Sequence, residues 1–155
     1  LLMTSPAKPQ SIVLLVQKEV AERIVAGPGQ MSVLALSVQL FGRPAISGFV
    51  SKDSFYPSPK VDSAILKITV HASPVVNLPQ KKLFQIIKIG FAAKRKTLAN
   101  NLAAGFNVSK SAAQLALQAS AIPIAARAQE LSIEDWQKLN IALEPLLNTA
   151  QTSGA

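Results

Sequence analysis

The sequence contains no cysteine, which excludes a disulfide framework, a thiolate metal site and a cysteine nucleophile. It contains a single histidine, His71, which argues against a catalytic triad and against a metal centre built from several histidines. His71 stands at the polar end of a strand pattern, where we expect it to be solvated or structural. These absences predict a protein that binds no metal.

Long hydrophobic runs are also absent. No apolar run approaches the ~20 residues that span a membrane, and the first residues lack the basic-then-apolar order of a signal peptide. The 155 residues suffice for one domain or for parts of two, and 49% of them are hydrophobic, enough for a core. We therefore expect a soluble, cytoplasmic protein without a membrane partner, and we expect a monomer.

Acidic residues are absent between Asp62 and Glu130, although the chain has eight. That stretch carries nine of the 16 basic residues, a charge of +9, and the remaining seven basic and eight acidic residues give −1, for a total of +8. A positive surface of this extent favours a polyanionic partner, and the alternative is a solvated surface with an accidental bias. The nine residues are Lys67, Lys81, Lys82, Lys88, Lys94, Arg95, Lys96, Lys110 and Arg127.

The first half of the chain predicts strands and helices in alternation. Residues 11–17 form a short apolar run typical of a buried strand, and residues 18–26 follow as an amphipathic helix. Residues 31–41 predict a helix packed on a sheet face, while 45–51 and 63–70 predict two further strands. A strand that runs directly into an amphipathic helix is half of a βαβ unit, so this part is expected to be α/β.

Near residue 75 the pattern changes to helices alone. Apolar residues at helical spacing predict a helix over 80–93 that continues over 94–104 and stops at Gly105. A further helix is expected over 110–120. The second part of the chain is therefore expected to be small, basic and all-α.

The last helix is predicted from its first turn. Ser132 and Asp135 have the spacing of a capping box, in which each side chain accepts a hydrogen bond from the other's backbone amide. Residues 151–155 predict a disordered tail. The buried face of this helix is expected to carry Trp136, Leu139, Leu143 and Leu146.

The α/β part lacks features that such a domain needs. No glycine-rich turn follows a first strand, and strand 11–17, expected to be buried on both faces, has too few neighbours within this chain. We expect that the N-terminal portion of a larger domain is missing.

Residues 55–63, FYPSPKVDS, predict a rigid extended segment. Pro57 and Pro59 each fix their own φ and disfavour the helical region for the residue before them. Such a segment suggests that neighbouring side chains are held in fixed positions.

Four segments, in the same order and at about the same spacing, resemble the ribosomal RNA adenine dimethyltransferase family: QKEVAERI (17–24), FYPSPKVDSAIL (55–66), FAAKRKTLANNL (91–102) and ARAQELSIEDW (126–136). The resemblance extends from about Leu1 to Leu146. The glycine-rich loop and the Asn-Leu-Pro-Tyr-like tetrapeptide of that family are not present in this chain.

The resemblance implies an α/β fold followed by a small all-α domain. Residues 1–75 would be the C-terminal part of a Rossmann-like methyltransferase domain, without its N-terminal cofactor-binding part. Residues 76–150 would be a helical rRNA-binding domain, followed by the tail over 151–155.

The family uses S-adenosylmethionine to dimethylate N6 of adjacent adenosines near the 3′ end of small-subunit rRNA. The resemblance implies this cofactor for the full-length parent, and it implies that this chain holds no catalytic or cofactor-binding residue and is inactive alone. The family's aromatic residue at the position of Phe55 lines the target-adenine pocket, with Pro57 and Pro59 beside it. The alternative is that Phe55 is an ordinary core residue.

Contacts to RNA phosphates are predicted at Lys94, Arg95 and Lys96, which would project outward from the helix expected there. Lys88 and Arg127 are further candidates. The expected partner is small-subunit rRNA or its pre-ribosomal particle. Within the same segment, Asn100 and Asn101 can be interpreted as capping, packing or RNA-contacting residues.

Two alternatives to a methyltransferase fragment remain open. The chain could be a non-enzymatic RNA- or ribosome-binding module that uses only the basic helical part. It could also be a transcription-factor-like descendant of the same family, which would prefer DNA to rRNA.

Overall fold

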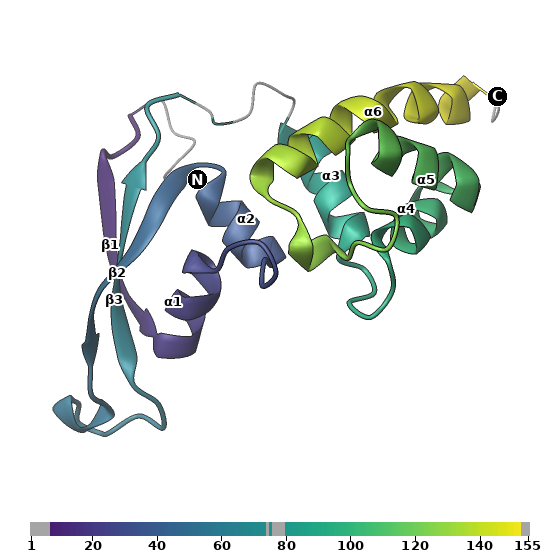
Figure 1. Cartoon of the computed structure of the whole chain (residues 1–155). Coiled ribbons are helices and arrows are strands. Elements are labelled where there is room, and N and C mark those ends of the chain that lie inside the picture. Colours follow the sequence, from purple (N-terminus) through teal and green to yellow (C-terminus); the bar gives the residue numbers. More distant parts are fainter. Residues whose placement is uncertain (1–6, 74, 76–79, 153–155) are drawn as a thin grey trace. The chain divides into compact units, whose positions relative to one another are not determined.

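The computed structural model of the chain describes residues 7–73, 75 and 80–152, with side chains described as far as Pro145 (Figure 1). The chain divides into two compact units. The first comprises the described residues up to Gly27 together with Leu34–Val75, and the second comprises Pro28–Val33 together with the described residues from Gln80 onward.

A three-stranded sheet forms the centre of the first unit (Figure 1). Its strands are β1 (Ser11–Gln17), β2 (Gly42–Val50) and β3 (Ser63–Val70), in the spatial order β1-β3-β2. β3 is antiparallel to both neighbours, so β1 and β2 run in the same direction on either side of it. The predicted strands at 11–17 and 63–70 are confirmed at both ends.

Two helices connect β1 to β2. α1 (Lys18–Val25) follows β1 without an intervening loop, and α2 (Val33–Gln39) precedes β2. The side chain of Gln39 donates hydrogen bonds from Nε2 to the carbonyl oxygens of Ile24, at 2.7 Å, and Ala26, at 2.9 Å. These carbonyls belong to the end of α1, where helical partners run out, so Gln39 satisfies them and joins α2 to α1.

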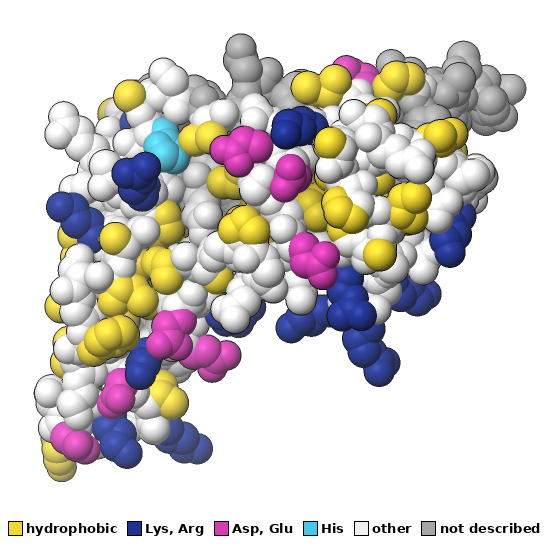
Figure 2. All heavy atoms as spheres, viewed as in Figure 1, with side chains coloured by type: hydrophobic (Ala, Val, Ile, Leu, Met, Phe, Trp, Pro, Cys, Tyr) yellow, Lys and Arg dark blue, Asp and Glu magenta, His cyan; other side chains and the backbone are white. Residues whose placement is uncertain are grey.

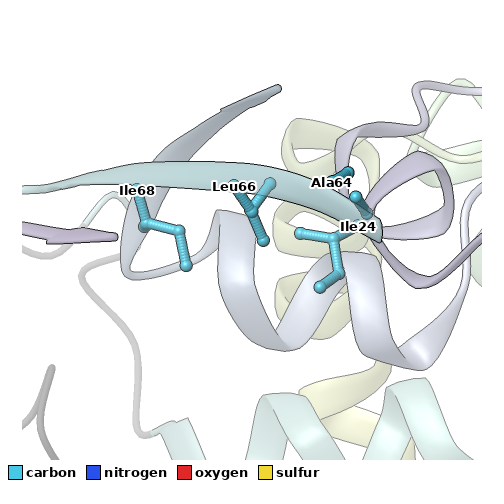
Figure 3. Packing of buried hydrophobic residues seen from close by; sticks show 5 residues of the cluster. Ile24, Ala64, Leu66 and Ile68 are labelled. Atoms are coloured by element: carbon cyan, nitrogen blue, oxygen red, sulfur yellow. The ribbon is translucent and has the colours of Figure 1, made fainter. Parts of the chain in front are cut away.

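The core of this unit lies between β3 and the helices (Figure 3). Ala64, Leu66 and Ile68 alternate along β3 with exposed or half-buried residues, as the period of two requires, and their buried side chains meet Ala21 and Ile24 of α1. Figure 3 shows Leu66 and Ile68 pointing from the strand toward the helices. The predicted burial of one face of this strand is therefore confirmed.

β1 differs from the prediction that it would be buried on both faces. Val13, Leu14 and Leu15 expose 61%, 42% and 54% of their surfaces. Among the described residues, β1 pairs only with β3, so one of its edges carries no partner strand. Burial on both faces is not observed, which agrees with the expectation that this strand has too few neighbours within the chain, since an apolar run indicates only what a strand could bury.

β2 begins three residues earlier than predicted and includes Pro44. In the described sheet β2 is an edge strand, where a residue without an N–H can be accommodated. Gly42 lies so close to β3 that a Cβ atom there would be 2.6 Å from Cγ2 of Ile68. A register shift between Ile46 and Gly48 marks a bulge, which bends the strand before the loop that follows it.

The regular elements among the described residues of the second unit are all helices, joined by turns and loops. Its buried side chains include Trp136 and Leu139, and Trp136 exposes only 1% of its surface. The predicted core role of Trp136 is confirmed, whereas that of Leu146 concerns a side chain outside the described ones. The elements are α3 (Gln80–Gly90), α4 (Leu98–Phe106), α5 (Lys110–Ala119), the short helix η3 (Ala128–Glu130) and α6 (Ile133–Thr152).

The predicted capping box at the start of α6 is confirmed. Asp135 N donates to Ser132 Oγ at 3.1 Å, and Ser132 N donates to Asp135 Oδ2 at 3.0 Å. α6 continues to Thr152, so the first two residues of the expected disordered tail are helical, and 153–155 lie outside the described residues.

The helix predicted to continue from 80–93 through 94–104 is interrupted. α3 ends at Gly90 and α4 begins at Leu98, with a turn over 91–97 between them. Gly90 is a poor helix former, and it lies so close to Trp136 that a Cβ atom there would be 2.5 Å from the indole ring.

Gly105 does not end α4, as predicted, but lies within it. The helix continues to Phe106 and ends at Asn107, which adopts the left-handed conformation (φ 53°) and donates its N–H to Ala103 O. A Cβ atom at Gly105 would be 2.3 Å from Cγ2 of Ile89. The glycine is therefore explained by the close approach of Ile89.

Candidate nucleic-acid interface

The loop between β2 and β3, residues 51–62, is closed by hydrogen bonds between its two ends. It contains the short helix η2 (Lys52–Ser54). The backbone N–H of Lys52 donates to Oδ1 of Asp62 at 3.0 Å, and Ser58 Oγ donates to Lys52 O at 3.0 Å. Lys18 N, at the start of α1, donates to Asp62 O at 3.0 Å. Asp62 thus joins both ends of the loop to α1, at the carboxyl ends of β1 and β2.

Phe55 and Tyr56 lie side by side in this loop with different exposure. Phe55 is half-buried in an extended conformation, and Tyr56 is fully exposed, at 103% of its reference surface. Pro57 and Pro59 are exposed. The assignment of Phe55, Pro57 and Pro59 to an adenine pocket stays a prediction.

An open depression of about 340 Å³ lies between this loop and α1. Three lysines and three acidic residues line it, so it offers no field of a single sign. Beside it, Lys18 Nζ lies 5.3 Å from the centre of the Phe49 ring, within the range of a cation–π interaction. The lining residues are Lys18, Glu19, Glu22, Lys52, Lys60, Val61 and Asp62.

Lys94, Arg95 and Lys96 lie in the turn over 91–97, which we call the basic turn. The prediction that they project from a helix was wrong, although all three are exposed as expected. The turn is ordered by backbone hydrogen bonds, with Lys96 N donating to Ala93 O at 3.0 Å. A tight turn displays three consecutive side chains outward, whereas a helix would distribute them over about 200°.

The first residue of the basic turn is anchored by an aromatic contact. The ring of Phe91 stacks on the buried Trp136, with centroids 5.9 Å apart and planes inclined by 26°. After the turn, Leu98 N donates to Ala126 O at 2.8 Å, which joins the start of α4 to the segment carrying Arg127.

Arg127 belongs to a segment that packs beside the basic turn. Lys94 and Lys96 line a small pocket of about 10 Å³ together with Ala128 and Gln129, and the Arg127 side chain is exposed. The structure therefore brings together two predicted cationic segments that are far apart in the sequence. Lys88 is exposed in the last turn of α3.

The exposed cations of the basic turn, α3 and the segment of Arg127 form no ion pair with a described acidic side chain, although the backbone N–H of Arg127 donates to Glu130 Oε2 at 3.2 Å. Within the described part of the chain, Lys82 and Glu144 form an ion pair at 2.8 Å, and none of the five predicted RNA-binding residues forms one. Figure 2 shows Lys and Arg side chains projecting from the second unit over the turn between α3 and α4. Unpaired, exposed cations on an ordered backbone are suited to a polyanion.

The side chain of Asn101 in α4 forms hydrogen bonds with the backbone at the start of the basic turn. Its side chain exposes 5% of its surface, and Nδ2 donates to Gly90 O at 2.6 Å and to Ala93 O at 3.2 Å. From the sequence, Asn101 can be interpreted as a capping, packing or RNA-contacting residue, and the structure shows it buried and hydrogen-bonded to backbone carbonyls, which is a packing role. Asn100, the preceding residue, is only half-buried.

A metal site is not formed by the described residues, among which no cluster of three or more His, Cys, Asp or Glu side chains occurs. No helix in the described ranges combines the length and the apolar character needed to cross a membrane.

The fold matches that of solved methyltransferases. The crystal structure of a dimethyladenosine transferase from Plasmodium falciparum superposes with a TM-score of 0.72 at 26% identity, over 93% of this chain and 60% of that one. The 23S rRNA methyltransferase ErmE superposes with a TM-score of 0.67 at 19% identity, which concerns the fold alone. The predicted fold class, a Rossmann-like α/β part followed by a small all-α part, is confirmed.

Residues 2–144 match the family described as ribosomal RNA adenine dimethylase, so the chain belongs to that family. Ribosomal RNA small subunit methyltransferase A of Dehalococcoides mccartyi (strain CBDB1) is 43% identical over 133 residues, 85% of this chain and 46% of that protein. Its namesake in Synechocystis is 40% identical over 142 residues, 89% of this chain and 49% of the relative. The chain thus spans about half the length of the curated relatives it matches.

Proposed function

We propose that this chain is part of an enzyme that dimethylates N6 of adjacent adenosines near the 3′ end of small-subunit rRNA, in the cytoplasm, during assembly of the small subunit. Family membership and the names of the relatives support the reaction class. The observation that best supports RNA as the partner is a surface of exposed cations without ion pairs to described residues. The basic turn and the segment of Arg127 form this surface.

The basic turn binds RNA through phosphates. Lys94, Arg95 and Lys96 would each neutralise backbone charge, which positions the RNA without reading its sequence. Release of counterions makes such binding strongly dependent on salt. Lys88 and Arg127 extend the same role to α3 and to the segment before η3.

The loop over 51–62 presents the target base. The ring of Phe55 forms one wall of a pocket for an extruded adenine, and stacking on an aromatic side chain contributes about 1–3 kcal/mol per base. Pro57 and Pro59 restrict the backbone beside it, and the hydrogen bond from Lys52 N to Asp62 closes the loop.

S-adenosylmethionine supplies the methyl group in this family, and the described residues do not fit it. β1 runs directly into α1 without a glycine-rich turn, and the depression beside the loop is lined by charged side chains. We therefore assign this chain no step of methyl transfer. Its own residues bind RNA and hold a base, and the chain would be inactive alone.

A non-enzymatic RNA- or ribosome-binding module is the second candidate, and the same lack of fit for a cofactor favours it. Both candidates require the cationic surface. They differ in whether the chain works as part of a methyltransferase, which the coding sequence upstream of Leu1 would decide by encoding or lacking the glycine-rich loop and the tetrapeptide.

The test of the RNA-binding surface is a matched pair of charge variants. One carries Lys94→Gln, Arg95→Gln and Lys96→Gln, and the control carries Lys67→Gln, Lys110→Gln and Lys138→Gln, which are exposed and lie outside the basic turn. Binding of a transcript of the 3′-terminal domain of small-subunit rRNA is measured across a range of salt concentrations.

We expect the first variant to lose most affinity and to show a slope of log Kd against log salt shallower by about two, since each lost phosphate contact removes about 0.7–0.9. The control variant should retain a steeper slope. Equal losses in the two variants would overturn the assignment of the surface to the basic turn, and stronger binding of duplex DNA than of rRNA would favour the transcription-factor-like alternative.

A further inference from the structure

Three exposed cations in succession repel one another, so their positions depend on what holds the backbone beneath them. In the basic turn the two flanks are held by Phe91 on Trp136 and by Leu98 N on Ala126 O. The stretch between these anchors has few backbone hydrogen bonds of its own, and Lys96 N to Ala93 O, at 3.0 Å, is one of them.

The side chain of Asn101 supplies two further hydrogen bonds to this stretch. Nδ2 has two hydrogens, and they are directed to Gly90 O at 2.6 Å and Ala93 O at 3.2 Å, the last carbonyl of α3 and a carbonyl just before Lys94. A single amide thus joins the end of the helix to the turn. Its hydrogen bond to Gly90 O is buried and that to Ala93 O is partly buried, so both are stronger than a fully solvated hydrogen bond.

Ala93 O accepts from both Asn101 Nδ2 and Lys96 N. Ala93 directly precedes the three cationic residues in the sequence, and Lys96 is the last of them. The hydrogen bond from Lys96 N to Ala93 O therefore closes the turn around them. Loss of the Asn101 amide would leave Gly90 O without this donor and Ala93 O with only the donor from Lys96 N, so that the backbone carrying Lys94, Arg95 and Lys96 could move relative to the end of α3.

We propose that Asn101 is a positioning residue for RNA binding, which acts through the basic turn by fixing the backbone from which Lys94, Arg95 and Lys96 extend. The proposal rests on the proposed function, since it assigns Asn101 no contact with RNA. Pre-ordering a cationic segment lowers the conformational entropy lost on binding, so Asn101 increases affinity although it is buried.

The experiment is a double-mutant cycle on the full chain with the same rRNA transcript. Asn101→Ala is combined with the Lys94→Gln, Arg95→Gln, Lys96→Gln variant, and Asn100→Ala, its neighbour in α4, is the control. A thermal unfolding curve for each variant sets a temperature at which all are folded. A residue that acts only on the stability of the fold would add its effect in both backgrounds.

We expect Asn101→Ala to weaken binding in the native background and to make the salt slope shallower by about one to two, because the cations are no longer held in one arrangement and fewer of them contact phosphates at the same time. In the charge-neutralised background it should change affinity less than twofold, and Asn100→Ala should have little effect in either. A loss of equal size in both backgrounds, or an equal loss in Asn100→Ala, would overturn the proposal.

Two further results distinguish a failure of the positioning role of Asn101 from a failure of RNA binding by the basic turn. If the charge variant binds rRNA as the native chain does, the proposed surface fails, and Asn101 has nothing to position. If Asn101→Ala does not fold, Asn101→Ser replaces it, and amide hydrogen exchange at Lys96 is measured without RNA. Faster exchange at Lys96, with unchanged exchange in α5, supports the positioning role, and unchanged exchange at Lys96 overturns it.

Discussion

The carboxylate of Asp62 accepts a hydrogen bond from the backbone amide of Lys52 at 3.0 Å and so joins the two ends of the loop that carries Phe55. Asp62→Ala removes that acceptor. We expect a loss of about 0.5–1.5 kcal/mol in the free energy of unfolding, the usual net value of one hydrogen bond, and faster hydrogen exchange at the Lys52 amide. Chemical denaturation measures the first and mass spectrometry the second. Exchange at Lys52 that stays at its native rate would show that the loop is closed by other contacts.

Phe55 and Tyr56 make a matched pair of aromatic residues for a stacking test. Phe55→Ala should weaken binding of a transcript with unpaired adenosines at its 3′ end by about 1 kcal/mol or more, because a base loses its stacking partner. Tyr56→Ala should change it less. Both variants are compared on the same transcript with abasic sites in place of the adenosines, where their difference should disappear. A larger loss in Tyr56→Ala would move the base-binding role to the exposed ring.

The absence of a fitting cofactor site in the described residues leads to a direct expectation. Titration calorimetry of the 155-residue chain with S-adenosylmethionine should give no binding heat at micromolar to millimolar ligand. A clear micromolar dissociation constant would contradict the conclusion that the present residues do not form the methyl-donor site.

Gly105 tests the close packing of α4 against α3. Gly105→Ala places a Cβ atom 2.3 Å from Cγ2 of Ile89, so it should destabilise the chain by about 1–3 kcal/mol despite the higher helix propensity of alanine. Gly27→Ala is the control, because no atom lies within 4 Å of a Cβ built there.

Gly105→Ala combined with Ile89→Ala should lose less stability than the sum of the two single changes, because the smaller side chain at 89 leaves room for the added Cβ atom. Thermal unfolding measures all four proteins. Additive losses would indicate that Gly105 is required for a reason other than its contact with Ile89.

The elements that sequence alone predicted best are those with a strong local signal. Strand 63–70 alternates buried and exposed residues along its length, and the box formed by Ser132 and Asp135 is a short-range motif, so both were found where expected. The apolar run of β1 indicated burial, and only the shortage of neighbouring strands in this chain indicated the exposure that is observed.

The turn over 91–97 was missed for a geometric reason. Phe91 and Leu98 are seven residues apart, nearly two helical turns, so the apolar period of 3.6 stays in phase across the interruption. Periodicity therefore predicted one long helix. The hydrogen bonds of Asn101 to Gly90 and Ala93 span 11 and eight residues and leave no periodic trace in the sequence.

The contacts of Asn101 are made to main-chain oxygen atoms, which every amino acid provides. These hydrogen bonds do not involve the side chains at 94–96, which are exposed. Substitutions at these three positions other than proline should leave the turn folded, so an evolving or engineered descendant could change the strength and salt dependence of its RNA binding there without needing a new fold.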